Sequence, residues 1–360
     1  MKKRTVAILT GGGDCPGLNA AIRGIAKVAM LDFGWDVLGI KDGYDGLIEG
    51  RYWKLQNSDV SNILPLGGTI LGTSNKANPF GYIAKKGDAP VDVSDRVVEN
   101  LKKWNVETLF CIGGDGTCAI ANRLQKKFPY IIGVPKTIDN DLLCTDQTFG
   151  FDTACSFVTE SLDRIHTTAQ SHHRAMVVEV MGRYAGWIAL CGGLAGGGDI
   201  ILIPEMPFNY EKVKEAILER SKKGKKFSII VVSEGARAQG EGYTVREVIS
   251  DSPDPIRLGG IGAKIADYVE NETGIESRVT VLGHLQRGGS PTFFDRVLAT
   301  KYGVTAARLA AKNDFGKIVA LRGTEVVGAS LEEATSGLKL VKKDNKLLRD
   351  AISLGTSFGF

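Results

Sequence analysis

The sequence predicts an α/β protein with doubly wound parallel sheets, because short apolar strands alternate with longer helical segments along the chain. The chain has 360 residues, more than the roughly 250 to 300 at which a single hydrophobic core stops growing. The predicted strands are also too many for one comfortable sheet. We therefore expect two packed domains. With 43% hydrophobic and 24% charged residues, the composition is that of a globular protein and excludes a disordered or membranous one.

The predicted elements follow from apolar runs and from helical periodicity. Short all-apolar runs are typical of strands buried in a parallel sheet, and apolar residues at helical spacing predict the helices between them. In the first part of the chain we predict strands at 5–10, 35–40, 108–112 and 130–134, helices at 20–30, 94–104 and 116–127, and polar turns at 41–46 and 66–76. In the second part we predict helices at about 152–170, 184–192, 209–223, 257–272 and 293–312, and strands at 175–181, 199–204, 227–233, 277–282 and 317–321.

A glycine loop between the strand at 108–112 and the following helix is suited to phosphate. Gly113 and Gly114 let a ligand approach the backbone where a Cβ would intrude, and the first N–H groups of the helix face that ligand. Asp115 is then the natural ligand for a Mg²⁺ ion bound to the phosphate. The alternative is an ordinary glycine-rich turn. The strand at 5–10 is also followed by glycines, but they do not form a dinucleotide fingerprint, and the chain has no P-loop.

Acidic and basic residues recur where other predicted strands end. Asp139 and Asp141 follow the strand at 130–134, so two neighbouring strands should bring carboxylates to one sheet edge. Arginines and a histidine flank the strands of the second part, namely Arg174, Arg183, Arg278, His284 and Arg287. We interpret these forked donors as a binding site for a phosphorylated small molecule. The alternative is a set of separate surface ion pairs.

The charge and cysteine content exclude other classes of function. The net charge of +4 is spread over the chain without a basic block of the kind that binds nucleic acid, so we expect small anionic partners. No apolar run reaches the roughly 18 residues of a membrane span. The six cysteines show no CxxC pair or metal-ligand spacing, which is typical of free thiols in a reducing cytosol, and we expect a cytoplasmic protein.

Five motifs, taken in chain order, resemble the 6-phosphofructokinase family. They are Gly113-Gly-Asp-Gly-Thr117, Thr137-Ile-Asp-Asn-Asp141, Met181-Gly-Arg183, the Glu234-Gly235 strand end and Gly283-His-Leu-Gln-Arg-Gly-Gly-Ser-Pro291. NAD kinases and lipid kinases share the first motif but not the combination. The resemblance covers nearly the whole chain and implies two doubly wound three-layer α/β/α domains facing each other across a cleft. Residues 1–150 plus about 287–335 would bind nucleotide and Mg²⁺, and residues 151–286 plus about 336–360 would bind fructose 6-phosphate.

The resemblance also implies the reaction and the roles of individual residues. The γ-phosphoryl group of Mg-ATP would pass to the 1-hydroxyl of fructose 6-phosphate, a step of glycolysis. Asp139 would act as the base, Thr137 and Asp141 would orient the hydroxyl and the metal waters, and Arg183 would stabilise the transferring group. The residues implied at the donor are Gly13, Tyr44, Asn75, Lys76, Gly114, Asp115, Gly116 and Thr117, with Asp115 on the metal.

The residues implied at the sugar phosphate are Thr137, Asp139, Arg174, Met181, Gly182, Arg183, Glu234, Arg278, His284 and Arg287. In the family Arg174 and Arg278 are usually lent by a neighbouring subunit. The resemblance therefore implies self-association to a homodimer or homotetramer, with no nucleic-acid or membrane partner.

Two positions bear on the phosphoryl donor. Pyrophosphate-using members of the family pair an aspartate after Gly-Gly-Asp with a lysine before the Thr-Ile-Asp-Asn-Asp motif, whereas ATP users have glycine at both. Here Gly116 follows the ATP pattern and Lys136 the pyrophosphate pattern. A carboxylate about 4 Å from the α-phosphate would cost up to about 4 kcal/mol at an effective dielectric of about 20, so its absence favours ATP.

Two alternatives stay open at this point. One is a pyrophosphate-dependent fructose 6-phosphate 1-phosphotransferase. The other is a non-catalytic regulator that binds a sugar phosphate, which should have lost Asp115 or Asp139. A further departure from the ATP-using pattern is Lys76, which stands near a position where bacterial members commonly have an arginine.

Overall fold

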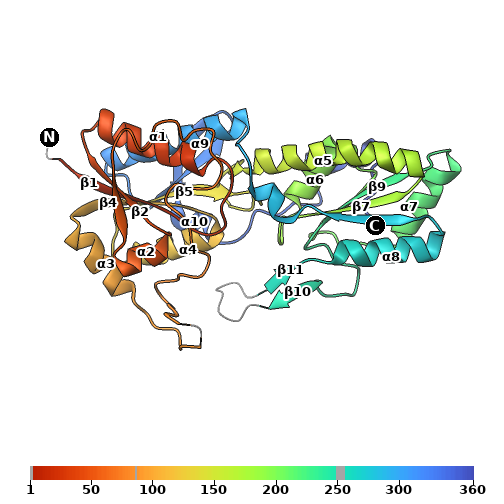
Figure 1. The fold of residues 1–360 in the computed structure, drawn as a ribbon, viewed down its shortest axis with the longest axis horizontal. Helices are drawn as coiled ribbons and strands as arrows, with labels where there is room; N and C mark the ends of the chain where they lie inside the picture. The colour runs from red at the N-terminus through yellow and green to blue at the C-terminus, as the bar shows by residue number, and fades with distance from the viewer. Residues whose placement is uncertain (1–2, 86, 249–255) are drawn as a thin grey trace.

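The computed structural model describes residues 3–85, 87–248 and 256–360. It has two lobes side by side, each built on a mostly parallel sheet with helices on both faces (Figure 1). The sheet of the larger lobe has eight strands and that of the smaller lobe four, while a separate two-stranded hairpin lies below the junction. The α/β fold class predicted from the sequence is confirmed.

The larger sheet is mostly parallel, and its strand order reverses near the middle of the sheet. Its strands are β1 (Thr5–Thr10), β2 (Asp36–Ile40), β3 (Tyr52–Leu55), β4 (Val106–Gly113), β5 (Ile131–Thr137), β6 (Phe149–Gly150), β13 (Lys317–Arg322) and β14 (Glu325–Ser330). They lie in the order β14-β13-β5-β4-β1-β2-β3, with β6 beside β5, and only the edge strands β3 and β14 run antiparallel to their neighbours. The chain order reverses between β1 and β4, which is where open α/β sheets bind ligands beyond the carboxyl ends of the strands.

Helices cover both faces of this sheet. One face carries α1 (Leu18–Leu31) and α9 (Phe293–Ala311), and the other α2 (Tyr44–Glu49), α3 (Ser94–Lys103), α4 (Asp115–Leu124) and α10 (Leu331–Ala334). The backbones of α1 and α9 lie close together, and glycines at the contact make this possible. A Cβ at Gly24 would lie 2.9 Å from the Thr300 carbonyl oxygen, and a Cβ at Gly303 would lie 2.5 Å from the Ala21 carbonyl oxygen. A late segment of the chain is thereby packed on the first helix.

The smaller lobe has a four-stranded parallel sheet. Its strands are β7 (Ala175–Val180), β8 (Ile200–Leu202), β9 (Ser228–Ser233) and β12 (Ser277–Val281), in the order β12-β7-β9-β8. Its helices are α5 (Phe151–His172) and α6 (Trp187–Ala195) on one face, α7 (Tyr210–Lys222) and α8 (Ile261–Thr273) on the other, the 3₁₀ turn η1 (Gly283–Arg287) and α11 (Lys346–Ser353). Buried side chains of α1, α9, α5 and α6 form one continuous core that joins the two lobes.

Several elements differ from the sequence-based prediction. The short strands β3 and β14, the hairpin of β10 (Val245–Val248) and β11 (Ile256–Leu258), and the helices α2, α10 and α11 were not predicted. The helix expected from residue 257 begins at Ile261, because Gly259 and Gly260 have φ angles of 138° and 94° that a helix cannot continue through. Among the described residues, no helix combines the length and apolar character that a bilayer crossing requires.

Candidate active site

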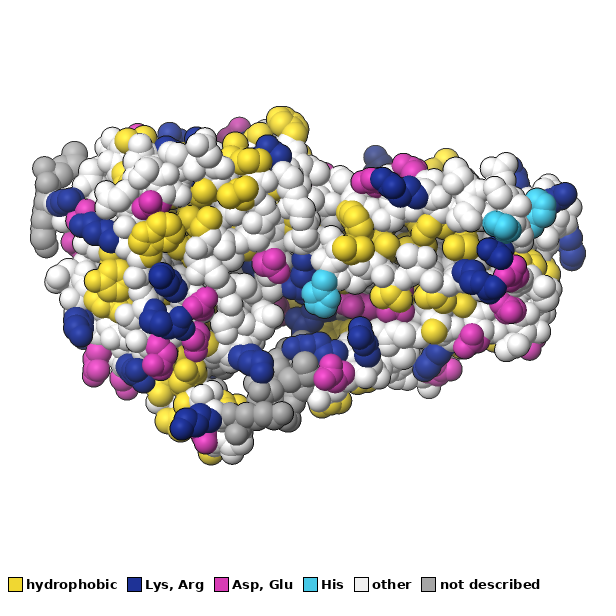
Figure 2. Space-filling view, viewed as in Figure 1, with side chains coloured by type: hydrophobic (Ala, Val, Ile, Leu, Met, Phe, Trp, Pro, Cys, Tyr) yellow, Lys and Arg dark blue, Asp and Glu magenta, His cyan; other side chains and the backbone are white. Residues whose placement is uncertain are grey.

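A cavity of about 700 Å³ lies where the strand ends of both lobes face each other. Figure 2 shows basic, acidic and histidine side chains gathered around the hollow between the lobes. The predicted site residues that line the cavity are Gly13, Tyr44, Asn75, Gly114, Asp115, Gly116, Thr117, Lys136, Thr137, Asp139, Met181, Arg183, Glu234, His284 and Arg287. Lys76, Asp141, Arg174, Gly182 and Arg278 are outside this lining.

The loop after β4 is shaped by close backbone contacts. A Cβ at Gly113 would lie 2.2 Å from the Cβ of Thr117, so only glycine lets the first turn of α4 fold back on the strand. Asp115 begins α4, and its carboxylate therefore sits at the positive end of the helix dipole. At Gly116 the added Cβ would meet no heavy atom of the described chain within 4 Å. Any side chain at this position would project into open space at the cavity.

Lys136 links the loops that follow β5 and β1. Its ammonium group donates a 2.5 Å hydrogen bond to the carbonyl of Gly13, and the residue is only 4% exposed. Burial lowers the pKa of Lys136, while the carboxylates of Asp139 and Asp115 favour its charged form. The lysine thus holds the glycine loop in place and brings positive charge to the base of the cavity.

Carboxyl groups from neighbouring strands act on one another in this cavity. Asp139 is 6% exposed, and its Oδ1 atom has no hydrogen-bond partner among the described residues. Burial raises the pKa of Asp139, the guanidinium groups of Arg287 and Arg183 oppose that rise, and the charge of Asp115 adds to it. Burial, with the charges of Asp139 and Asp115, raises the pKa of Asp141 to about 8.

The smaller lobe supplies a carboxyl group and a backbone turn with unusual geometry. Arg183 has a φ of 50° and Gly182 a φ of 139°, and a Cβ at Gly182 would lie 2.6 Å from the Ala185 carbonyl. The backbone N–H of Arg183 donates a 3.2 Å hydrogen bond to Oε1 of Glu234. Burial raises the pKa of Glu234 to about 7. Strain of this kind is held by the surrounding structure and clusters at functional sites.

Arg287 joins the two sides of the cavity. A Cβ at Gly13 would lie 1.5 Å from Nη1 of Arg287, so the guanidinium group of the smaller lobe rests directly on the glycine loop of the larger lobe. Arg287 also acts electrostatically on Asp139, Lys136 and Glu234. The cavity is therefore lined by carboxylates together with several basic side chains, which suits a phosphorylated substrate that arrives with a metal ion.

Comparison with known proteins identifies the family. The family model "Phosphofructokinase" matches residues 5–310. The chain belongs to the phosphofructokinase family. It is 52% identical to "ATP-dependent 6-phosphofructokinase 2" of Clostridium perfringens, over 99% of this chain and 98% of that protein. It is 49% identical to a "Pyrophosphate--fructose 6-phosphate 1-phosphotransferase" of Amycolatopsis mediterranei, over 93% of this chain and 96% of that one.

Solved structures of the family have the same fold. The Pichia pastoris phosphofructokinase in the T-state matches with a TM-score of 0.81 and 30% identity, covering 99% of this chain and 37% of that longer one. A pyrophosphate-dependent phosphofructokinase of Nitrosospira multiformis matches with a TM-score of 0.82 at 21% identity, which bears on the fold alone. The family motifs used in the sequence comparison thus lie on a shared two-lobed fold.

Two of the predicted sugar-phosphate ligands lie away from the cavity of this chain. Arg174 precedes β7 and Arg278 is the second residue of β12, so both are near the amino ends of strands whose carboxyl ends face the cavity. Nε of Arg174 lies 2.8 Å from Oε2 of Glu276, and Nη1 of Arg278 lies 3.7 Å from Oε2 of Glu270. In this chain the two arginines form ion pairs of the kind that the alternative interpretation foresaw.

The sequence analysis missed other residues of the cavity. Arg246 and Arg257 line it from the β10–β11 hairpin, which carries no apolar run that would have marked it as a strand pair. Glu179 also lines it and accepts hydrogen bonds from the N–H groups of Gly260 and Gly262, at 3.0 and 2.8 Å. The sequence signal that could have identified Glu179 is an acidic residue inside an otherwise apolar run, Ala175–Val180.

The carboxylates of the cavity suit a divalent cation that is bound together with a phosphate-containing substrate. Among the described residues there is no cluster of three or more histidine, cysteine, aspartate or glutamate side chains that could hold a metal. Asp115 and Asp139 nevertheless line one cavity, and Oδ1 of Asp139 lacks a partner. Mg²⁺ typically takes one or two carboxylates and completes its shell with phosphate oxygens and water, so these residues fit it.

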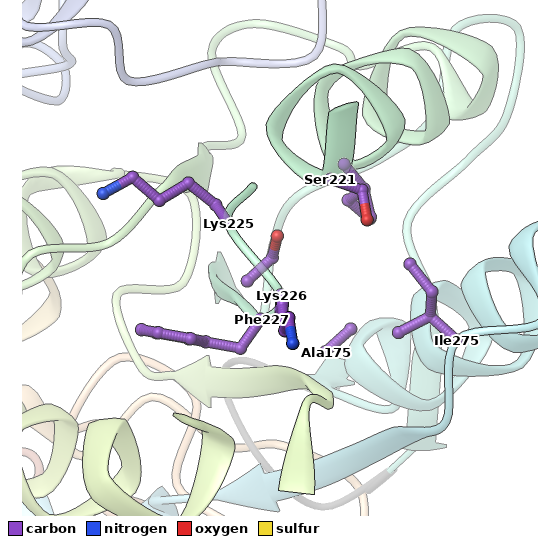
Figure 3. Close-up of a pocket in the computed structure, with 8 residues that line it drawn as sticks. Ala175, Ser221, Lys225, Lys226, Phe227 and Ile275 are labelled. Carbon is purple, nitrogen blue, oxygen red and sulfur yellow. The ribbon is translucent and has the colours of Figure 1, made fainter. Parts of the chain in front are cut away.

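A second pocket lies at the other end of the smaller sheet (Figure 3). It is lined by Ala175, Ser221, Phe227 and Ile275 among others, with Lys225 and Lys226 beside them. The space between these side chains leaves no room for even a water molecule. We regard it as a packing gap.

Proposed function

We propose that this chain is an ATP-dependent 6-phosphofructokinase, which transfers the γ-phosphoryl group of Mg-ATP to the 1-hydroxyl of fructose 6-phosphate. The observation that carries the proposal is that Asp115 and Asp139, from neighbouring strands of one sheet, line the same cavity as Arg183 and Arg287 of the other lobe. Phosphoryl transfer needs a positioned base and fixed positive charge around the phosphoryl oxygens, and we assign these roles to Asp139 and to the basic residues of the cavity. Curated relatives that are about half identical carry this activity in their names.

Asp139 is the proposed general base. In its ionised form it can accept the proton of the sugar hydroxyl, because its Oδ1 atom is not engaged by the described residues. A positioned base of this kind typically accelerates a reaction about 10²- to 10⁴-fold. Thr137 accepts a 3.1 Å hydrogen bond from the N–H of Asp139 and so helps to fix the loop. In this proposal Asp141, which ends the same motif, would act with Thr137 to orient the sugar hydroxyl and the metal waters.

Positive charge around the transferring group comes from three sources. Arg183 and Lys136 line the cavity, and so does the start of α4, where the helix dipole is positive. Groups that are fixed before the reaction stabilise developing charge without reorganising. A Mg²⁺ ion held by Asp115 would neutralise charge on the phosphate oxygens.

The remaining residues are assigned by their place around the cavity. The residues assigned to the donor side are Tyr44, Asn75, Gly114, Gly116 and Thr117, together with Lys76, which follows Asn75 in the sequence. The hydroxyl of Tyr44 donates a 3.0 Å hydrogen bond to the Thr117 carbonyl, which leaves its ring to face the nucleotide. Glu234 and Met181 would contact the sugar, and His284 and Arg287 its 6-phosphate.

We further propose that a second subunit supplies Arg174 and Arg278 to the sugar phosphate. Both lie outside the cavity of their own chain, near the amino ends of β7 and of the edge strand β12. The proposed enzyme is then a homodimer or homotetramer. We also propose that the chain divides into a donor domain of residues 1–150 plus about 287–335 and a sugar-phosphate domain of residues 151–286 plus about 336–360, with Arg287 itself on the smaller lobe as the last residue of η1.

Pyrophosphate is the second candidate donor, because the buried ammonium of Lys136 is attractive to either substrate. The test is purified protein with fructose 6-phosphate and Mg²⁺, offered ATP or pyrophosphate in parallel, with fructose 1,6-bisphosphate measured. ATP turnover that exceeds pyrophosphate turnover supports the proposal. Turnover with pyrophosphate alone would replace it by the second candidate, and fructose 6-phosphate binding without turnover would favour a regulator.

A further inference from the structure

A short segment near the C-terminus, residues 338–341, runs behind the loop that carries the proposed base. We call residues 338–341 the C-terminal strap. Leu338 pairs with Leu142 in an isolated antiparallel bridge, and the N–H of Lys339 donates a 2.7 Å hydrogen bond to the carbonyl of Asp141. The strap is therefore joined by backbone hydrogen bonding to the segment that directly follows Asp139.

The side chain of Lys339 adds three further bonds to the same loop. Its Nζ atom lies 2.9 Å from Oδ1 of Asn140, 2.9 Å from the carbonyl of Thr145 and 2.9 Å from the carbonyl of Asp146. These bonds can occupy all three ammonium protons. Asn140 is the residue next to Asp139 and has a φ of 52°, a left-handed conformation that asparagine tolerates, and its Oδ1 atom also accepts a 3.1 Å hydrogen bond from the N–H of Thr148. The ammonium group thus closes the loop 140–146 on itself.

The strap is also linked to the segment that follows Arg183 in the chain. The indole N–H of Trp187 donates a 2.7 Å hydrogen bond to the carbonyl of Lys339. Glu205 accepts hydrogen bonds from the N–H of Val341 at 2.8 Å and from the N–H of Gly186 at 2.9 Å. The strap is thus bonded directly to the loop that follows Asp139 and, by way of Glu205, to Gly186 at the end of the loop that carries Arg183.

We propose that Lys339 is a positioning residue for phosphoryl transfer, which fixes Asp139 through Asn140 and keeps it in register with Arg183. The inference rests on the proposed function. Lys339 does not line the cavity, so it acts without touching either substrate. A base must be held within a fraction of an ångström of its productive position, since a misplacement of about 1 Å can reduce the rate about 100-fold.

Lys339 is partly buried, yet its pKa stays above neutral. Burial lowers the pKa of Lys339 from 10.5 to about 8, and the carboxylate of Asp146 opposes that fall. The Trp187 ring lies 5.6 Å from Nζ, which also favours a cation. A neutral side chain at this position would leave Asn140 and the two carbonyls without their shared donor.

The test compares Lys339→Met with the wild type in steady-state assays at pH 7, with Lys343→Met as a matched control. Lys343 is an exposed lysine four residues further along the chain. We expect Lys339→Met to lower kcat about 10- to 100-fold and to change the KM for fructose 6-phosphate and for ATP less than about threefold, because only the position of the base is altered. Lys343→Met should leave both parameters unchanged.

A double-mutant cycle separates positioning from loss of structure. Asn140→Gly keeps a residue that tolerates the positive φ but removes the side-chain acceptor of Lys339. If Lys339 acts through Asn140, adding Lys339→Met to Asn140→Gly should reduce kcat much less than it does in the wild type. Circular dichroism and thermal denaturation of each variant check that the chain is folded.

The outcomes distinguish this inference from the proposed function. A wild-type protein without fructose 6-phosphate kinase activity would refute the proposed function. An active wild type together with Lys339→Met within about twofold of its kcat would refute only the role of Lys339, as would losses that simply add in the double variant.

Discussion

The choice of phosphoryl donor can be tested by placing a carboxylate at Gly116. This residue lies in the first turn of α4 and lines the cavity, and an added Cβ would meet no described atom within 4 Å. The fold should therefore accept Gly116→Asp without a clash. An aspartate near a helix N-terminus is also favourable, and removal of a helical glycine gains about 0.5 to 1 kcal/mol. We expect the thermal stability of the variant to be equal to or higher than that of the wild type.

The effect on ATP follows from Coulomb's law. A carboxylate about 4 Å from a nucleotide phosphate costs about 1 kcal/mol in bulk water and about 4 kcal/mol at an effective dielectric of about 20. Gly116 is exposed at the cavity, so the effect lies between these limits. Since about 1.4 kcal/mol is tenfold, kcat/KM for ATP should fall between about fivefold and about a thousandfold.

The assay is steady-state kinetics at several ATP concentrations and at two ionic strengths. Gly116→Asn is the matched control, because it has nearly the same volume without the charge. The asparagine variant should lose much less activity than the aspartate variant, and added salt should reduce the difference between them. Unchanged ATP kinetics in Gly116→Asp would refute the reasoning, and equal losses in both variants would show that volume, not charge, is responsible.

Three further predictions concern the same cavity. Asp139→Asn should lower kcat about 10²- to 10⁴-fold with little change in substrate KM, because it removes the base, and a smaller loss in single-turnover assays would contradict that role. Gly13→Ala should reduce kcat/KM at least about tenfold while the melting temperature changes little, since its Cβ would displace only the flexible end of Arg287. Folding raises the pKa of Asp141 from 3.8 to about 8, so between these pH values the unfolded chain loses this proton while the folded chain keeps it. The free energy of unfolding therefore falls as the pH rises through that interval. Asp141→Asn should therefore stabilise the protein most near pH 8 and least near pH 4 in urea unfolding, and a pH-independent difference would contradict the buried-carboxyl explanation.

The central strands and their helices could be predicted because their sequence patterns are strong. The strands β1, β4 and β5 each contain a short apolar run that is followed by glycines or acidic residues, so both the element and its functional end were visible. The edge strands β3 and β14 are short, largely exposed and antiparallel, with no continuous apolar run, and the pattern of a buried strand therefore missed them.

The site was predictable where a residue follows a strand directly, as Asp115, Asp139 and Arg183 do. Contacts between distant segments were not. No local pattern indicates that the ammonium of Lys136 bonds to Gly13, or that Arg287 lies on the same glycine. The contacts of Lys339 with Asn140 span 199 residues of sequence, and such pairings follow only from the assembled fold.

The close packing of α9 on α1 bears on how the protein is made. The larger lobe contains β13, and its first helix, α1, is covered by α9. All the strands of the smaller sheet lie between α1 and α9 in the chain. During synthesis, part of the sheet formed by the N-terminal strands therefore stays uncovered until α9, which ends at Ala311, has left the ribosome. Because chains emerge at about 5 to 20 residues per second, this interval lasts at least about 15 seconds. The smaller lobe can complete its sheet first, and a nascent chain arrested before α9 should depend on chaperones for its solubility.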